Sequence, residues 1–367
     1  MNPLALFVAL VGALLFSASV VLPIWLGAVL KRMGRQRSRP TELRATPSVT
    51  VIIPAYLESG VIGRKVEEST RALSRAGVLG EVIVVASDME TALAAGAADL
   101  VIHGARGGKA AACNEGVAAS HGEVIVLTDA NCRIGPDDWV SRTLELLGQW
   151  SLVSANKTEV NSSESAFWWL ERKVKRGTAG AFGTLAVAGE FMASRRADYR
   201  PLEESLILDD FAMAADISER GLGVTVADDI WTEESAATPH DQWERRVRIA
   251  EGLLSEAVPR APSLVRSPAG LMFVAHKLYR VTLGCIGFWI MVGGATFAAP
   301  VVSFLVPIAA LYAVLAYAGH VRVPHSMRGL STVVGLQFVP VAATWRLVKR
   351  RLAASDDNRG LWAKVAR

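Results

Sequence analysis

Two long apolar segments bracket this chain, and they most constrain what it can fold into. Residues 4–30 are almost wholly apolar, and so are residues 281–319. A bilayer-spanning helix needs about 20 apolar residues, and both segments supply that length. Between them lies a segment of mixed composition, roughly 220 residues long, which suits one large α/β domain. We therefore expect a water-exposed α/β domain flanked by membrane-spanning helices.

The first apolar segment could be a retained helix or a cleaved signal peptide. No basic residue precedes its apolar core, the core is longer than that of a usual signal peptide, and its basic cluster follows it. These features favour a retained helix whose C-terminal end lies in the cytoplasm. Pro23 would kink this helix or mark its lower end.

Much of the basic excess lies beside the apolar segments. The net charge is +4, and the basic residues in question are Lys31, Arg32, Arg35, Arg37, Arg39, Lys277, Arg280, Lys349, Arg350 and Arg351. Basic residues in these places favour the cytoplasmic face and anionic lipid over nucleic acid. The three cysteines lack metal-ligand spacing and fit a reducing compartment.

These observations predict a multi-pass protein of the cell's inner membrane with its main domain in the cytoplasm. The expected parts are a transmembrane helix at 1–30, a basic linker at 31–47, the α/β domain at 48–260, a juxtamembrane or interfacial segment at 261–280, a transmembrane hairpin at 281–319, and an interfacial helix with a basic tail at 320–367. Residues 330–346 are assigned to the interface because a further span would place the last basic cluster outside.

Short apolar runs alternate with helical patterns through the central segment. Continuous apolar runs are typical of strands that are covered on both faces. Strands are expected at 49–54, 81–86, 99–102 and 124–127, and helices at 61–76 and 109–120. This alternation predicts a mostly parallel sheet with helices on both faces.

The run at 124–127 leads into the acidic turn Asp129-Ala130-Asn131. This turn would stand at the carboxyl edge of the sheet, where open α/β folds bind ligands. Two oxygen ligands two residues apart suit a divalent cation that carries phosphates. The same residues could instead cap the turn and the next helix.

Other acidic residues fall at strand ends or helix starts of the same sheet, namely Glu58, Asp88 and the Asp209–Asp210 pair. Gly107-Gly108-Lys109 places a cation before a helix start, a natural phosphate contact. It is not a Walker loop, because Ala110 stands where Ser or Thr is required. No Gly-x-Gly-x-x-Gly turn follows the first strand, which argues against a dinucleotide fold.

Taken in order, these residues resemble the family 2 glycosyltransferases, which are inverting, membrane-associated enzymes with a Rossmann-like GT-A domain. The resemblance covers roughly residues 48–285. Each part is weak alone, but together they keep a sensible spacing. The parts are Val51–Tyr56 with Glu58, Asp88, Gly108–Gly116, Thr128–Asn131, Gly189–Arg196, Leu208–Asp210, Gln242–Arg248 and His276-Lys277-x-x-Arg280.

The resemblance implies a binding role for the first group of matching residues. Those that would line the nucleotide pocket are Pro54, Ala55, Tyr56 and Glu58. Asp88 would hydrogen-bond the base, most often uracil in this family, and Lys109 would lie near the nucleotide. Asp129 and Asn131 would hold Mg²⁺ or Mn²⁺ on the diphosphate.

The resemblance also implies the catalytic groups. Asp210, with Asp209 beside it, would be the general base, although the pair could simply cap a helix. Gln242, Arg245 and Arg246 would contact the acceptor and the diphosphate. The alternative for these arginines is a solvated or lipid-facing basic helix.

Three positions depart from the family pattern. Leu57 stands where Asn is usual, Asn131 replaces the second Asp of the metal motif, and Arg246 stands where processive members carry Trp. A neutral ligand at Asn131 should hold the metal more weakly. The change at Arg246 speaks against a synthase that builds its own polymer channel.

The sequence therefore predicts an inverting hexosyltransferase that moves a sugar from a nucleotide sugar, with UDP-sugar expected, to a lipid-linked or membrane-presented glycan. One alternative is a processive polysaccharide synthase with partner subunits of a polysaccharide pathway. The other is a non-catalytic membrane scaffold that binds nucleotide sugars. Nucleic acid is not an expected partner.

Overall fold

An eight-stranded sheet forms the centre of the domain, with strand order β3-β2-β1-β4-β7-β6-β8-β5. The computed structural model describes residues 2–32, 43–104, 107–159, 178–234, 239–298, 308–313, 315, 317, 321 and 328–352. The strands are β1 (Val49–Ala55), β2 (Gly80–Ala86), β3 (Leu100–His103), β4 (Val124–Thr128), β5 (Arg133–Gly135), β6 (Leu152–Glu159), β7 (Phe191–Arg195) and β8 (Val224–Glu234). The four strands expected from the apolar runs all form, and β1 continues through Pro54 to Ala55.

The sheet is parallel in its first half and mixed in its second. Four of the seven strand pairings are parallel, and β7 runs antiparallel to both β4 and β6. The prediction of a mostly parallel sheet did not include this reversed strand. Because β7 is reversed, its first residue lies at the edge where β4, β6 and β8 end. Thr128, the last residue of β4, is paired with Phe191, the first residue of β7.

Helices cover both faces of the sheet. On one face, α4 (Lys109–Ala119) and α7 (Asp209–Glu219) pack in a core that includes Ile52. On the other face, α2 (Ser59–Ala76) and α5 (Trp139–Leu147) pack in a core that includes Val51 and Ile53. Successive residues of a strand point to opposite faces, so one strand contributes to both cores. The expected α/β architecture is therefore present.

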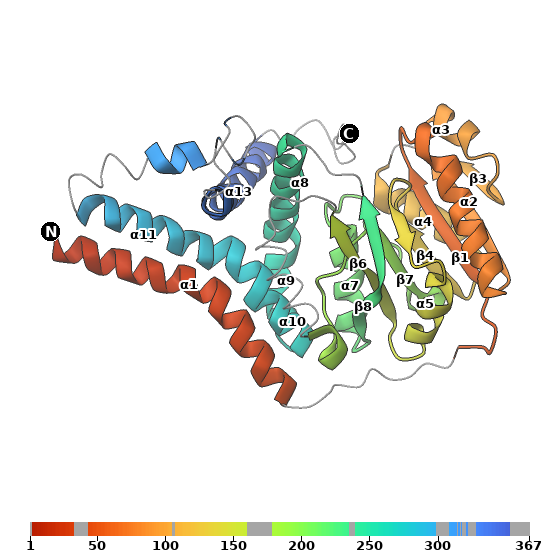
Figure 1. The fold of residues 1–367 in the computed structure, drawn as a ribbon, viewed down its shortest axis with the longest axis horizontal. Coiled ribbons are helices and arrows are strands. Elements are labelled where there is room, and N and C mark those ends of the chain that lie inside the picture. Colours follow the sequence, from red (N-terminus) through yellow and green to blue (C-terminus); the bar gives the residue numbers. More distant parts are fainter. Residues whose placement is uncertain are drawn as a thin grey trace.

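The N-terminal helix α1 (Pro3–Arg32) runs beside α11 (Cys285–Ala298) and away from the sheet domain (Figure 1). Pro23 lies inside α1, which bends along its length in Figure 1. Glycines allow the two helices to touch. A Cβ atom at Gly12 would lie 2.2 Å from the backbone nitrogen of Met291, and one at Gly294 would lie 2.5 Å from that of Ala9. Small residues at such contacts are typical of helices packed within a membrane.

Three helices are long and apolar enough to cross a membrane among the residues described, namely Pro3–Arg32, Pro268–Ala298 and Ser331–Leu352. The second contains α10 (Pro268–Phe273), the π-helical turns η3 (Val274–Leu278) and η4 (Arg280–Gly284), and α11. It begins before residue 281, where we expected the first arm of the hairpin. Much of the second arm, at 300–319, and the tail after 352 lie outside the described residues.

The C-terminal helix α13 (Arg328–Leu352) packs against α8 (Pro239–Gly252), a helix that also reaches the sheet domain. Val247 and Ala250 of α8 form an apolar cluster with Val339 and Ala343 of α13. Two ion pairs flank that cluster. Arg346 lies 2.6 Å from Glu244, and Arg350 lies 2.9 Å from Glu251. In Figure 1, α13 runs crosswise to the pair formed by α1 and α11.

Candidate active site

The sheet topology gathers most of the expected site residues at one edge. Strands β1, β2, β4, β6 and β8 all end there, and the reversed strand β7 begins there. Glu58, Asp88 and Asp129 therefore share this edge, as the strand pattern predicted. The turn that precedes β7 adds Gly189 and Glu190, and β6 and β8 add further charged side chains.

Hydrogen bonds to buried groups hold the acidic turn at Asp129 in place. The Asp129 amide donates to the carbonyl oxygen of Glu190 at 3.2 Å, and the Thr128 hydroxyl donates to the same oxygen at 2.9 Å. Behind the turn, the buried ammonium of Lys65 on α2 donates to the carbonyl oxygen of Cys132 at 2.9 Å. These contacts fix the backbone of the turn, so the Asp129 side chain projects from a rigid base.

Lys109, at the first position of α4, joins the acidic turn to α7. Its ammonium lies 2.7 Å from Asp129 Oδ1 and 3.7 Å from Asp209 Oδ2, and it donates to the carbonyl oxygen of Gly189 at 2.8 Å. Burial alone would lower the pKa of Lys109, but the carboxylates of Asp129 and Asp209 outweigh it and raise that pKa well above its usual range. Lys109 thus remains a cation between the two acids.

Asp210 lies beside this cluster in the first turn of α7. Burial, followed by the negative charge of Asp209, raises the pKa of Asp210 to about 6, against the opposing effects of Lys109 and Arg248. Gly189 leaves room for the carboxyl group, since a Cβ atom there would lie 3.2 Å from the Cβ of Asp210. A carboxylate whose pKa is near neutrality can take a proton in one step and release it in the next.

The loop before α7 is held by a third acid that the sequence patterns did not single out. Glu256, in the π-helical turn η2 (Leu253–Ala257), accepts hydrogen bonds from the amides of Ile207 at 2.6 Å and Leu208 at 3.1 Å. It therefore fixes the point at which α7 begins. Its carboxylate also adds to the negative field around Asp209 and Asp210.

Asp129 and Asn131 form a donor set that fits a small divalent cation. The amide oxygen of Asn131 is buried and has no hydrogen-bond partner, so it is available as a ligand. Carboxylate and amide oxygens are the ligands that Mg²⁺ and Mn²⁺ prefer. Within the described part of the chain, no group of three or more His, Cys, Asp or Glu side chains could hold a metal. Phosphate oxygens and water would have to supply the remaining ligands.

The loop after β1 was expected to line a nucleotide pocket, and the structure adds a role for Asp88 there. Pro54 and Ala55 are buried at the end of β1, and Tyr56 and Glu58 follow them. Asp88 accepts hydrogen bonds from the amides of Leu57 at 2.7 Å and Thr91 at 2.9 Å. It therefore caps α3 (Met89–Ala94) and holds the loop.

Leu57 has a φ of 54°, in the left-handed region. Asn adopts this conformation more readily than Leu, because its short polar side chain can hydrogen-bond locally. This backbone geometry explains why Asn suits the position better. The hydrogen bond from the Leu57 amide to Asp88 offsets part of the strain.

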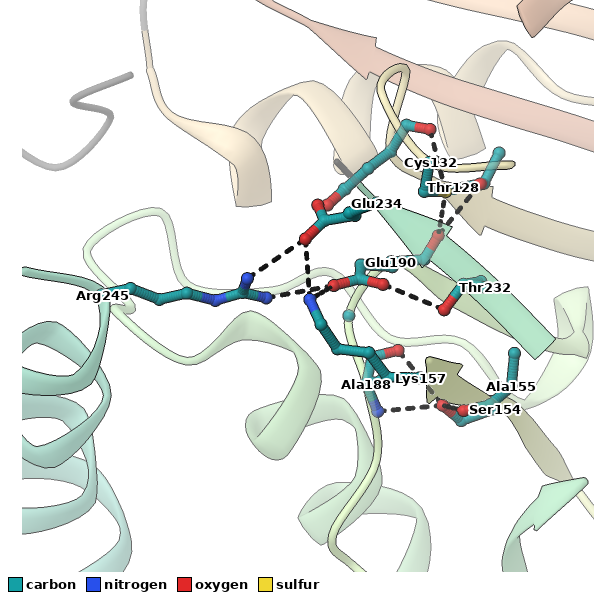
Figure 2. Close-up of polar contacts among 12 residues, drawn as sticks. Thr128, Cys132, Ser154, Ala155, Lys157, Ala188, Glu190, Thr232, Glu234 and Arg245 are labelled. Carbon is teal, nitrogen blue, oxygen red and sulfur yellow. Dashed lines mark hydrogen bonds and ion pairs between the residues drawn. The ribbon is translucent and has the colours of Figure 1, made fainter. Parts of the chain in front are cut away.

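A second charged cluster lies beside the acidic turn (Figure 2). It contains Lys157 of β6, Glu190, Thr232 and Glu234 of β8, and Arg245 of α8. Of the basic helix predicted to touch the site, Arg245 reaches the cluster. Gln242 and Arg246 are half-buried on the same helix. Sequence patterns missed Lys157, Glu190 and Glu234. Glu190 lay within the quoted Gly189–Arg196 motif, but nothing marked its side chain as paired.

Comparisons with known proteins show which family and which fold the chain resembles. Residues 50–204 match the model of the family described as glycosyl transferase family 2. The mannosyltransferase PcManGT from Pyrobaculum calidifontis, solved in complex with GDP-Man and Mn²⁺, is similar in structure. It has a TM-score of 0.67 at 21% sequence identity, over 95% of this chain and 100% of that one.

Two more distant structures are similar over part of the fold. Mannosyl-3-phosphoglycerate synthase from Rubrobacter xylanophilus gives a TM-score of 0.43 at 14% identity, over 58% of this chain and 76% of that one. S. aureus TarS 1–349 gives 0.40 at 14% identity, over 82% and 92%. None of the curated proteins compared with the chain matches it.

The fold and the matched residues define the class of protein as a nucleotide-sugar-dependent glycosyltransferase with a GT-A domain. Residues 50–204, which match the model of glycosyl transferase family 2, carry this likeness. The matched range includes the acidic turn and Lys109. Asp209, Asp210 and helix α8 lie beyond it, so their assignment depends on the geometry described above.

Proposed function

We propose that this enzyme transfers a hexose, with inversion, from a nucleotide sugar to a lipid-linked or membrane-presented glycan at the cytoplasmic face of the membrane. One observation carries the proposal. A carboxyl group whose pKa is about 6, Asp210, lies beside a lysine that is already paired with the acidic turn at Asp129. This arrangement supports a base for the acceptor next to a binding site for the departing phosphate.

The proposed step needs one base and a neutralised leaving group. Asp210 takes the proton of the acceptor hydroxyl, and that oxygen forms a bond to the anomeric carbon of the sugar. The bond from that carbon to the β-phosphate oxygen breaks, and the nucleoside diphosphate leaves with the electron pair. Attack from the side opposite the phosphate inverts the anomeric centre.

Several residues would stabilise the negative charge that develops on the diphosphate. Lys109 and Arg245 supply positive charge close to the acidic turn. Asp129 and Asn131 would hold Mg²⁺ or Mn²⁺, which when bound would neutralise phosphate charge as a Lewis acid. The structure of PcManGT holds Mn²⁺ and GDP-Man, which supports a divalent metal and adds guanine to the uracil that the family resemblance favours.

The surface of α13 supports placement of the acceptor at the bilayer. Four exposed apolar side chains lie at helical spacing on this helix, namely Val341, Trp345, Val348 and Leu352. The ammonium of Lys349 lies 5.6 Å from the centre of the Trp345 ring. An apolar face edged with basic residues suits a helix that lies in the membrane interface. The same helix is also long and apolar enough to cross a membrane, so the interfacial position of residues 330–346 stays a prediction.

Turnover by the full-length enzyme tests the proposal. The purified protein in detergent or lipid discs is given UDP- and GDP-sugars, Mn²⁺ and a membrane lipid extract. We expect one sugar to be added to a lipid-soluble acceptor with an inverted linkage, and no addition by the Asp210→Asn variant. A ladder of long products would point to a processive synthase instead. Nucleotide-sugar binding with no transfer or hydrolysis would point to a scaffold.

A further inference from the structure

We propose that Glu190 is a positioning residue that fixes the guanidinium of Arg245 for the donor diphosphate. This inference rests on the proposed function, in which Arg245 contacts that diphosphate. Glu190 stands immediately before β7, at the edge of the sheet where the acidic turn lies. Its carboxylate and its backbone carbonyl hold two different parts of the site.

The carboxylate of Glu190 is fully engaged (Figure 2). One oxygen contacts the ammonium of Lys157 and lies 3.0 Å from Nη2 of Arg245. The other oxygen accepts a hydrogen bond from the Thr232 hydroxyl at 2.9 Å. With both oxygens occupied, the carboxylate has one orientation, so it can impose an orientation on Arg245.

Glu234 completes the arrangement from the end of β8. Its Oε2 lies 3.1 Å from Nη1 of Arg245 and 2.7 Å from the Lys157 ammonium. The two terminal nitrogens of Arg245 therefore each face a different carboxylate. Because the guanidinium is planar and its N–H groups are fixed in a fork, two such contacts set the plane of the group.

Charge and burial indicate which member of the cluster faces outward. The side chains of Lys157, Glu190 and Glu234 are 8%, 4% and 5% exposed, whereas that of Arg245 is 29% exposed. Among the four charged side chains described above, two carboxylates face two cations. Lys157 thus prevents the two acids from over-neutralising Arg245, which is the member that reaches solvent.

The backbone of Glu190 gives the arrangement its connection to the acidic turn. Its carbonyl oxygen accepts the amide of Asp129 at 3.2 Å. One residue thereby fixes the turn that would carry the cation and the arginine that would meet the phosphates. The spacing between these two charges is set by a single position at the start of a strand, and not by a flexible loop.

Nucleotide binding measured on a double-mutant cycle tests this role. The full-length protein, Glu190→Gln, Arg245→Ala and the double variant are titrated calorimetrically with UDP and with GDP, each with Mn²⁺. For the nucleotide that binds, we expect Glu190→Gln to weaken affinity about tenfold or more, as loss of an orienting partner does. In the Arg245→Ala background the same substitution should change nucleotide affinity by less than about twofold, because Glu190 would have no arginine left to orient.

Other outcomes separate this inference from the proposed function. If Glu190→Gln weakens binding equally in both backgrounds, or does not weaken it at all, the positioning role is wrong while the proposed function stands. If Arg245→Ala binds like the wild type, the assignment of Arg245 fails and this inference fails with it. If neither nucleotide binds the wild type, the proposed function itself is wrong, and so is the inference.

Two further variants control for folding. Glu251→Gln removes a similarly buried carboxylate that pairs with Arg350 of α13, and it should leave nucleotide affinity unchanged. A loss there would show that any buried carboxylate matters, and would overturn the inference. If Glu190→Gln does not fold, Thr232→Val keeps all four charges and removes one hydrogen bond to Glu190. It should weaken binding only where Arg245 is present, and wild-type affinity would overturn the inference.

Discussion

Two charged clusters lie side by side at one edge of the sheet, and they are built on opposite principles. The first, formed by Lys109, Asp129, Asp209 and Asp210, has three acids for one cation and contains a buried carboxylate oxygen of Asp209 without a hydrogen bond. The second, formed by Lys157, Glu190, Glu234 and Arg245, has equal charges, and its carboxylates are paired with cations.

This difference in charge balance separates the side chains expected to take part in the reaction from those that fix the geometry of the site. An excess of negative charge is unfavourable until a cation or a proton arrives. Burial, and then the negative charge of Asp209, raises the pKa of Asp210. A buried cluster in which carboxylates are paired with cations fixes the geometry of its members, including the partly exposed guanidinium of Arg245. The first cluster therefore suits chemistry, and the second suits support.

The largest effect is expected for the base of the first cluster. Asp210→Asn keeps the shape of the side chain but cannot accept the acceptor's proton, so kcat should fall by about 10³-fold. The KM for the donor should change little. Steady-state kinetics measures both, with Asp209→Asn as the matched control, which should retain more activity. An Asp210→Asn variant that kept more than about a tenth of wild-type kcat would contradict the assignment.

Removing a cation from the second cluster should lower the stability of the protein. Lys157→Met leaves two buried carboxylates with one cation, and breaking such a network costs about 3–5 kcal/mol. Thermal unfolding in detergent should show a large fall in Tm. Lys109→Met is the matched change in the first cluster. It should lower Tm less, because the side chains of Lys109 and Asp129 are 23% and 29% exposed and water can solvate the charges left behind. Equal losses from the two variants would erase the distinction between the clusters.

The two proposed metal ligands of the acidic turn should contribute unequally to metal binding. Asp129→Ala removes the charged ligand and should lower activity by about 100-fold, whereas Asn131→Ala should lower it by less than about tenfold. The Mn²⁺ concentration needed for half-maximal activity should rise more for Asp129→Ala. If the two variants behaved alike, the neutral ligand would be as important as the charged one.

The smallest expected effect is a pH-dependent gain in the stability of the Asp210→Asn variant. The pKa of Asp210 is about 6 in the folded chain against an ordinary 3.8, so the folded chain holds this proton more tightly. The free energy of unfolding therefore falls as pH rises from about 4 to about 6, and the penalty is complete above that range.

Asp210→Asn removes this penalty. Above about pH 6 the free energy of unfolding of this variant should exceed that of the wild type by on the order of 2–3 kcal/mol. Below about pH 4 the two proteins should unfold alike, because the wild-type carboxyl group is then protonated in both states. Thermal unfolding across this range measures the difference. A gain that was constant with pH would mean that Asp210 is not the titrating group.

Sequence patterns located the first cluster because its members follow strands and begin helices. Apolar runs end at Thr128 and Ala86, so the strand pattern alone could place Asp129 and Asp88 on one sheet edge. Strand β7 could not be placed in this way, because its segment is rich in small residues and its direction depends on pairing with β4. The charged residues that it brings together, Glu190 and Lys157, therefore lie far apart in the sequence without a shared signal.

Asp88 shows a second limit of sequence patterns. The family resemblance suggested a contact with the base, but sequence patterns contain no information about backbone amides. In the structure its carboxylate holds the amide of Leu57 and caps α3. A side chain can be placed at a site by sequence and still be engaged by the protein itself.

The glycine contacts between α1 and α11 carry a consequence for biosynthesis. The first helix leaves the ribosome long before its partner, since the whole sheet domain separates Arg32 from Cys285. At translation rates of roughly 5–20 residues per second, α1 must wait on the order of tens of seconds before α11 is made. During that time the close-packing surface at Gly12 has no partner helix. The helix that is made first is therefore among the last to reach its final packing.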